Sequence, residues 1–236
     1  PRYSLERWGK VRNYVLWFNR LGRDLKEIHD HFVATGLMTE QNWKKLIADP
    51  VGLEQLPACS TCGGSAAQYE SLSLDGAYDL VCNTPRDLDV HLPKLRTLAE
   101  KCEHVTEVSN RRESMVAMAA ARPKKLVSYN TEQDGLYSHV AAKLNNGSGV
   151  EFAGFKLTSD RIVEIEPTEM LFIDSRHNYA TLKNELERFA PQVRRYIVLH
   201  DTEIYGENGE GGGPGLLTAV REYVRANREW SVIEHD

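Results

Sequence analysis

Two short apolar runs flank an amphipathic helix in the second half of the chain. The runs cover residues 170–173 and 196–199, and each stops at charged or polar residues. Between them, residues 180–190 place Leu182, Leu186 and Phe189 on one helical face. This order of strand, helix and strand is typical of a βαβ unit. The two strands are therefore predicted to be parallel neighbours in one sheet.

The same alternation of apolar runs and amphipathic segments continues through residues 84–236. Thr84 as an N-cap and Pro85 in the first turn are helix start signals. The pattern predicts further strands at 104–108, 125–129, 150–155 and 230–234. It predicts helices at 85–101, 114–121, 138–145 and 216–226. The predicted fold class is α/β, a Rossmann-like, doubly wound and mostly parallel sheet with helices on both faces.

A helical arm precedes this predicted domain. Apolar residues recur at spacings of three and four through residues 1–50, which predicts a long or broken amphipathic helix. We therefore divide the chain into a helical arm with its linker, 1–83, and a Rossmann-like domain, 84–236. An apolar stripe needs a surface to cover it, on the same chain or on a second subunit of a homo-oligomer.

Cys59 and Cys62 form a CxxC pair in the linker, followed by two glycines. Such a pair resembles half of a zinc site, but a structural zinc site needs a full tetrahedral set. The sequence has no second close pair, and Cys82 with His91 completes the set only in an irregular arrangement. The favoured interpretation is a turn with incidental thiols.

Composition narrows the classes of partner. The net charge is -5, and basic residues are scattered among acidic ones, which argues against nucleic acid. No apolar run reaches the roughly 18 residues of a membrane span, and no signal segment opens the sequence. Four cysteines in 236 residues do not form a disulfide scaffold. The sequence predicts a soluble, cytoplasmic, ordinary globular protein.

Residues that could catalyse a reaction or bind a metal follow both strands of the βαβ unit. Asp174 follows the first strand and His177 lies three residues on, while His200 and Asp201 follow the second strand. Parallel strands bring their carboxyl ends to one sheet edge, where open α/β sheets bind ligands. We therefore expect a functional site here. The alternative is that both aspartates only cap their loops.

Three segments resemble a known enzyme family. They read FIDSRHNY, YIVLHDT and GE-x-GEGGGPGL. They resemble class I S-adenosylmethionine-dependent methyltransferases, in the branch with cephalosporin hydroxylase-like and macrocin O-methyltransferase-like proteins. The resemblance runs from residue 84 to the end and is most specific over 171–216. It implies an O-methyltransferase that uses S-adenosylmethionine and acts on a small hydroxylated substrate, a sugar or secondary metabolite.

The resemblance also implies cofactor-binding positions. In the family, an acidic residue at the first strand is followed by a glycine-rich turn, and another acidic residue follows the second strand. Residues after the third strand border the adenine of the cofactor. The matching cofactor-binding candidates are Glu107, Ser109, Asn110, Asn130, Glu132 and Asp160. Ser109 stands where the family has glycine. Asn110 tolerates the left-handed conformation, so it can form the turn in place of glycine.

The metal-dependent members of the family imply a divalent metal site. Asp174 and Asp201 match the metal-binding carboxylates, which suit magnesium. His200 is a third candidate ligand, and an imidazole shifts the preference toward manganese, iron or zinc. His177 is the preferred general base, because an imidazole titrates near neutral pH. The metal would lower the pKa of a substrate hydroxyl and so prepare it for methyl transfer.

Two other functions compete with this hypothesis. Asp174, His177 and Asp201 could hold iron in a cephalosporin hydroxylase-like metal oxygenase. Alternatively, Ser109 in place of glycine suggests a degenerate methyltransferase fold that serves as a binding or assembly module. The glycine-rich segment 205–215 is too acidic for a phosphate loop and is predicted to be a lid or substrate-facing flap.

Overall fold

The structure is a computed structural model that describes residues 69–84, 86 and 88–233. The predicted helical arm within residues 1–50 and the Cys59–Cys62 pair lie outside the described residues. Residues 69–78 and 91–233 belong to one compact unit, which contains the whole sheet. The fold and the site are described within this unit.

Five parallel strands form the sheet, in the order β3-β2-β1-β4-β5. They are β1 His104–Ser109, β2 Lys125–Asn130, β3 Glu151–Phe155, β4 Thr168–Asp174 and β5 Val193–Leu199. All four strand pairs are parallel, and β4 pairs directly with β5. The predicted parallel βαβ unit is thus confirmed. The strand order changes direction between β1 and β4, which is where such sheets bind ligands.

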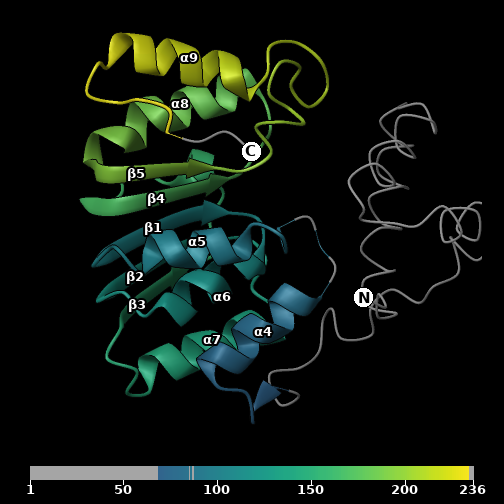
Figure 1. Cartoon of the computed structure of the whole chain (residues 1–236), viewed down its shortest axis with the longest axis vertical. Coiled ribbons are helices and arrows are strands. Elements are labelled where there is room, and N and C mark those ends of the chain that lie inside the picture. Colours follow the sequence, from purple (N-terminus) through teal and green to yellow (C-terminus); the bar gives the residue numbers. More distant parts are fainter. Residues whose placement is uncertain (1–68, 85, 87, 234–236) are drawn as a thin grey trace, which may run out of the picture. The chain divides into compact units, whose positions relative to one another are not determined.

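Helices cover both faces of the sheet (Figure 1). Because right-handed crossovers lead from β1 outward to β3 and from β4 outward to β5, their helices lie on opposite faces. The helices are α5 Leu92–Ala99, α6 Arg112–Ala121, α7 Gly135–Asn145, α8 Tyr179–Phe189 and α9 Leu216–Ala226, and two 3-10 turns are η2 Ser159–Arg161 and η3 Ala190–Gln192. The predicted Rossmann-like, doubly wound fold class is confirmed.

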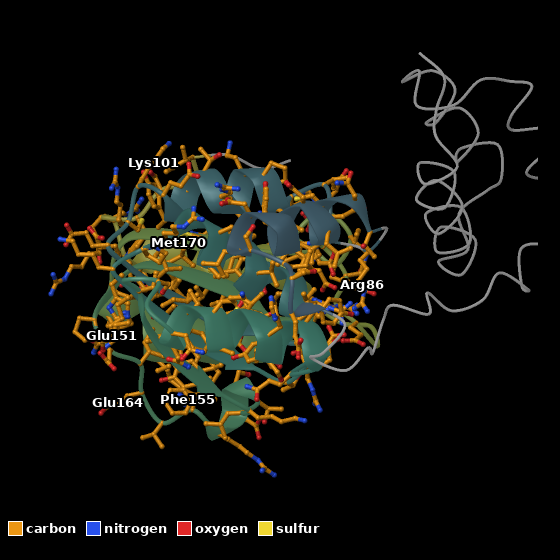
Figure 2. All side chains as sticks on the ribbon, turned by 90° about the horizontal axis from the view of Figure 1, so that it is seen from below. Arg86, Lys101, Glu151, Phe155, Glu164 and Met170 are labelled. Carbon is orange, nitrogen blue, oxygen red and sulfur yellow. The ribbon has the colours of Figure 1, made fainter. Side chains whose placement is uncertain are left out.

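The core beneath α8 and α9 follows the predicted apolar pattern. Leu182, Leu186 and Phe189 of α8 are buried against Leu171 and Ile173 of β4. Figure 2 shows Met170 of β4 inside the unit, whereas Phe155 and Glu164 lie at its surface. Asn178 caps α8 by accepting the amide of Thr181 at 2.9 Å, which fixes where the helix begins after the β4 loop.

The prediction of one helix from 85 to 101 was wrong. Helix α4 spans Leu74–Asn83, a region without a clear predicted pattern, and α5 begins only at Leu92. Thr84 does not start a helix; its hydroxyl donates to the Leu80 carbonyl at 2.7 Å in the last turn of α4. Pro93 provides the start signal for α5 instead.

The prediction of a sixth strand at 230–234 was also wrong. Of these residues the structure describes 230–233, and none of the four is in a strand. Val232 and Ile233 are 61% and 80% exposed. Their apolar side chains match strand propensity, but a strand also needs a neighbour that accepts its backbone hydrogen bonds. Here only Trp230 packs against the core.

Candidate functional site

The loops after β4 and β5 bring the predicted aspartates and histidines together. Ile173 and Leu199 are register partners, so Asp174, the last residue of β4, lies beside His200, the first residue after β5. The His200 amide donates to the Ile173 carbonyl at 3.2 Å and extends the pairing by one residue. Asp201 then adopts a left-handed backbone with φ of 57°. A non-glycine residue in this conformation is strained and is typical of functional sites.

Four side chains meet at this point and form what we call the tetrad: Asp174, His177, His200 and Asp201. His177 Nε2 lies 3.3 Å from Asp174 Oδ1 and 3.3 Å from Asp201 Oδ2. His200 Nδ1 lies 3.4 Å and 3.5 Å from the same two oxygens. Each imidazole nitrogen thus faces both carboxylates. Among the described residues, this is the group that could hold a metal ion.

The carboxylates and imidazoles of the tetrad stabilise each other's charged forms. Burial alone would raise the pKa of Asp174, but hydrogen bonds from His177 and His200 outweigh burial and lower the pKa to about 2. Burial likewise would lower the pKa of His177, but Asp174 and Asp201 raise it. Asp174 is therefore an ionised, buried carboxylate at neutral pH. Its Oδ2 atom accepts no hydrogen bond from any described residue.

The glycine-rich segment holds His177 in place. The Tyr205 ring stacks on His177 at 4.8 Å with an interplanar angle of 8°. The Glu210 amide donates to the His177 carbonyl at 2.7 Å, and the Gly209 amide donates to the Gly213 carbonyl at 3.0 Å. The segment predicted to be a flap is thus tied to the loop that carries His177. On the other side of the tetrad, the exposed His91 ring meets His200 edge-on at 5.5 Å.

Gly209→Ala is expected to displace this segment from His177. A Cβ at Gly209 would lie 2.8 Å from the Pro214 carbonyl oxygen and 3.2 Å from that of His177, and both are backbone atoms. We expect a loss of about 1 to 3 kcal/mol in the free energy of unfolding, measured by urea denaturation. Gly76→Ala in α4 is the control, because its Cβ would make only ordinary contacts of 3.4 Å or more. Equal stability of the two variants would contradict the packing role of Gly209.

The turn after β1 is closed by side-chain hydrogen bonds. Ser109 Oγ accepts the Arg111 amide at 2.9 Å, and Asn130 Nδ2 donates to the Arg111 carbonyl at 2.6 Å. Neither Ser109 nor Asn110 has a positive φ, so the left-handed conformation predicted for Asn110 is not used. The turn therefore forms without glycine.

Two predicted cofactor residues lie beneath this turn rather than at its surface. Glu107 is fully buried and accepts hydrogen bonds from Ser114, Ser128 and Asn130 at 2.6, 2.5 and 3.1 Å. Asn130 is also fully buried, and its Oδ1 accepts the Glu132 amide at 2.9 Å. Both residues support the turn. No sequence pattern points to Ser114 and Ser128, which become partners of Glu107 only when α6 and β2 pack on β1.

The remaining predicted cofactor residues lie at the surface. Asn110 is exposed, and its amide donates to the Asp174 carbonyl at 3.1 Å, which joins the turn to the tetrad. Glu132 is half-buried, and its Oε2 accepts the Arg112 amide at 3.3 Å at the start of α6. Asp160 is exposed on η2, where a hydrogen bond from Thr158 lowers its pKa. The interactions that shift its pKa come from its own backbone, Thr158, Arg161 and Arg176 rather than from the other five residues.

This chain has distant likenesses among solved structures. The crystal structure of an O-methyltransferase from Bacillus cereus in complex with SAH aligns with 78% of this chain and 86% of its own, at 13% sequence identity and a TM-score of 0.46. No protein-family model matches the sequence, and no curated protein matches it. The likeness is too distant to bear on activity, which is argued from the site. No described helix is long and apolar enough to cross a membrane.

Proposed function

We propose that the protein is an S-adenosylmethionine-dependent, divalent-metal-assisted O-methyltransferase that acts on a small hydroxylated molecule, a sugar or secondary metabolite. The observation that supports this proposal is the tetrad at the carboxyl edge of β4 and β5, next to the turn after β1. The candidate metal site thus lies at the sheet edge where α/β sheets bind ligands. The choice of S-adenosylmethionine as the methyl donor is supported by the sequence resemblance to methyltransferases.

The tetrad fits a divalent ion. Asp174 and Asp201 would hold it together with His200, and the Oδ2 atom of Asp174 is a buried carboxylate oxygen without a hydrogen bond from the described residues. A buried, unsatisfied carboxylate oxygen is costly unless a cation compensates it. A bound divalent ion lowers the pKa of a coordinated hydroxyl. Asp174 and Asp201 would orient such a hydroxyl by holding the ion in place.

The turn after β1 offers a polar surface for S-adenosylmethionine. Asn110 and Glu132 would hold the cofactor, since both reach the surface of the turn, while Glu107 and Asn130 keep the turn in shape from beneath. The cofactor supplies an electrophilic methyl group. His177 is proposed as the acceptor of the hydroxyl proton, or as a further ligand, because its Nε2 faces both carboxylates.

Titration calorimetry of S-adenosylmethionine tests the proposal, with and without a divalent ion. We expect a dissociation constant on the order of micromolar. Glu132→Ala should weaken binding about tenfold, since a hydrogen bond to a charged group contributes roughly 1.5 kcal/mol or more. Glu164→Ala, at the surface in Figure 2, is the control. Absence of binding in both conditions would overturn the proposal and favour the degenerate binding or assembly module.

The two imidazoles of the tetrad favour a second candidate function, a metal oxygenase. Two histidines and a carboxylate are the ligands of non-haem iron oxygenases. His177, His200 and Asp174 offer that set within one cluster. Dioxygen consumption by the iron-loaded protein, with no affinity for S-adenosylmethionine, would support this candidate over methyl transfer.

A further inference from the structure

We infer that His177 is a metal ligand and that the complete tetrad selects a borderline transition ion, such as Zn²⁺, Fe²⁺ or Mn²⁺, over Mg²⁺. This inference rests on the metal site of the proposed function, but not on methyl transfer. It assigns His177 a role that excludes proton transfer at the same nitrogen, because a nitrogen whose lone pair binds a metal cannot accept a proton.

The first argument is the spacing of the four atoms. The nitrogen–oxygen separations within the tetrad are 3.3, 3.3, 3.4 and 3.5 Å. Ligands of a tetrahedral ion with bonds of about 2.1 Å lie about 3.4 Å apart. Ligands of octahedral Mg²⁺, with bonds of about 2.05 Å, lie about 2.9 Å apart at neighbouring positions. Four of the six distances between the ligand atoms are therefore close to the tetrahedral value.

The same separations are long for charge-assisted hydrogen bonds, including the 3.3 Å hydrogen bond between His177 Nε2 and Asp174 Oδ1. A charge-assisted hydrogen bond between an imidazolium and a carboxylate is about 2.7 to 2.9 Å long. His177 and His200 instead stand back from both carboxylates by similar distances. One ligand atom of each tetrad residue lies within 4.8 Å of those of the other three. A small inward movement of the side chains would place all four on one ion.

The second argument is the type of donor. Two of the four donors are imidazole nitrogens, and Mg²⁺ prefers oxygen ligands and keeps several waters. Imidazole suits zinc, iron and other first-row transition ions. His200 is only 8% exposed and Asp174 only 3%, which leaves little room for the water shell of Mg²⁺ beside them.

The third argument is the rigidity of His177. Its ring is stacked on Tyr205, and its backbone carbonyl accepts the Glu210 amide. A metal ligand benefits from a fixed position, because its side chain is then set in place before the ion binds. The left-handed backbone of Asp201 similarly fixes the carboxylate opposite His177. Backbone strain of this kind is kept only where the surrounding structure holds it.

Metal titrations of the full chain test the inference, without cofactor or substrate. Apo protein is titrated with Zn²⁺, Mn²⁺ and Mg²⁺, and Co²⁺ provides a visible spectrum that reports coordination number and nitrogen ligation. We expect the transition ions to bind at least about 100-fold more tightly than Mg²⁺. His177→Gln should weaken them by about 100-fold or more, since even residues behind the ligands contribute about 10 to 100-fold. The Co²⁺ spectrum should change in the same variant.

His104→Gln is the matched control. His104 begins β1 and lies at the amino edge of the parallel sheet, away from the tetrad, so its variant should keep wild-type affinity. Equal or tighter binding of Mg²⁺, or unchanged affinity and Co²⁺ spectrum in His177→Gln, would overturn the inference and leave the proposed methyl transfer intact. Tight transition-metal binding without any affinity for S-adenosylmethionine would instead overturn methyl transfer alone.

Discussion

Asp174→Asn and Asp201→Asn are expected to leave the protein folded and to remove the stabilisation that a divalent ion gives the wild type. A ligand present at 100 times its dissociation constant adds about 2.7 kcal/mol to the free energy of unfolding. Each substitution replaces a negatively charged ligand of the tetrad with a neutral amide. Both variants should therefore show no shift in denaturation midpoint when Zn²⁺ or Mn²⁺ is added, as measured by circular dichroism.

Asparagine is the suitable replacement at both positions. At Asp201 the backbone is left-handed, with φ of 57°, and asparagine tolerates this conformation much better than alanine. Loss of metal stabilisation then reports the missing charge rather than a displaced loop. Asp160→Asn is the control, because Asp160 is an exposed acid outside the tetrad. A full metal-induced shift in Asp174→Asn would rule out this aspartate as a ligand.

The same two substitutions should suppress methyl transfer once an acceptor is known. If the bound ion contributes about 4 kcal/mol to the transition state, its loss slows the reaction about a thousandfold. A variant that loses metal stabilisation but keeps its rate would show that the ion serves structure only.

The sequence predicted the parts of the fold and site that depend on local pattern. The apolar runs that become β4 and β5 end abruptly at Asp174 and His200, so their pairing and shared edge followed from the βαβ rule. The convergence of Asp174, His177, His200 and Asp201 followed in turn from that edge. Their separate roles stay predictions until metal and cofactor are measured.

What the sequence could not predict depends on contacts between distant segments. Thr84 has the local features of a helix start, yet its hydroxyl binds the Leu80 carbonyl because α4 ends there. Tyr205 carries no motif, and only the course of the glycine-rich segment stacks it on His177. Gly209 likewise matters through the close approach of two backbones rather than through its own conformation.

Glu107 is a case in which contacts between distant segments determine the pKa of a side chain. The family resemblance made Glu107, near the end of the first strand, a cofactor-binding candidate, but packing of α6 and β2 buries it completely. Burial raises its pKa from an ordinary 4.5 to about 7, although hydrogen bonds from Ser114, Ser128 and Asn130 oppose the rise. Near neutral pH, the folded protein therefore holds a proton on Glu107 that the unfolded chain has released.

Glu107→Gln is expected to remove a pH dependence of stability. A folded-state pKa above the unfolded one means that stability is fully present below pH 4.5 and is lost as pH rises toward about 7. The total loss in the wild type is about 3 kcal/mol, because each pKa unit corresponds to about 1.36 kcal/mol. Glutamine stays neutral, and the Ser114 and Ser128 hydroxyls can donate to its oxygen or accept from its amide.

Urea denaturation of the wild type and Glu107→Gln between pH 4.5 and 8 measures this difference. Groups common to both proteins cancel when the two curves are subtracted, so the difference isolates Glu107. The stability of the variant relative to the wild type should rise between pH 4.5 and about 7 and then level off. Glu164→Gln, at the surface in Figure 2, should run parallel to the wild type. Parallel curves for Glu107→Gln would mean that Glu107 is ionised in the folded protein, which would return it to the set of residues able to bind a ligand.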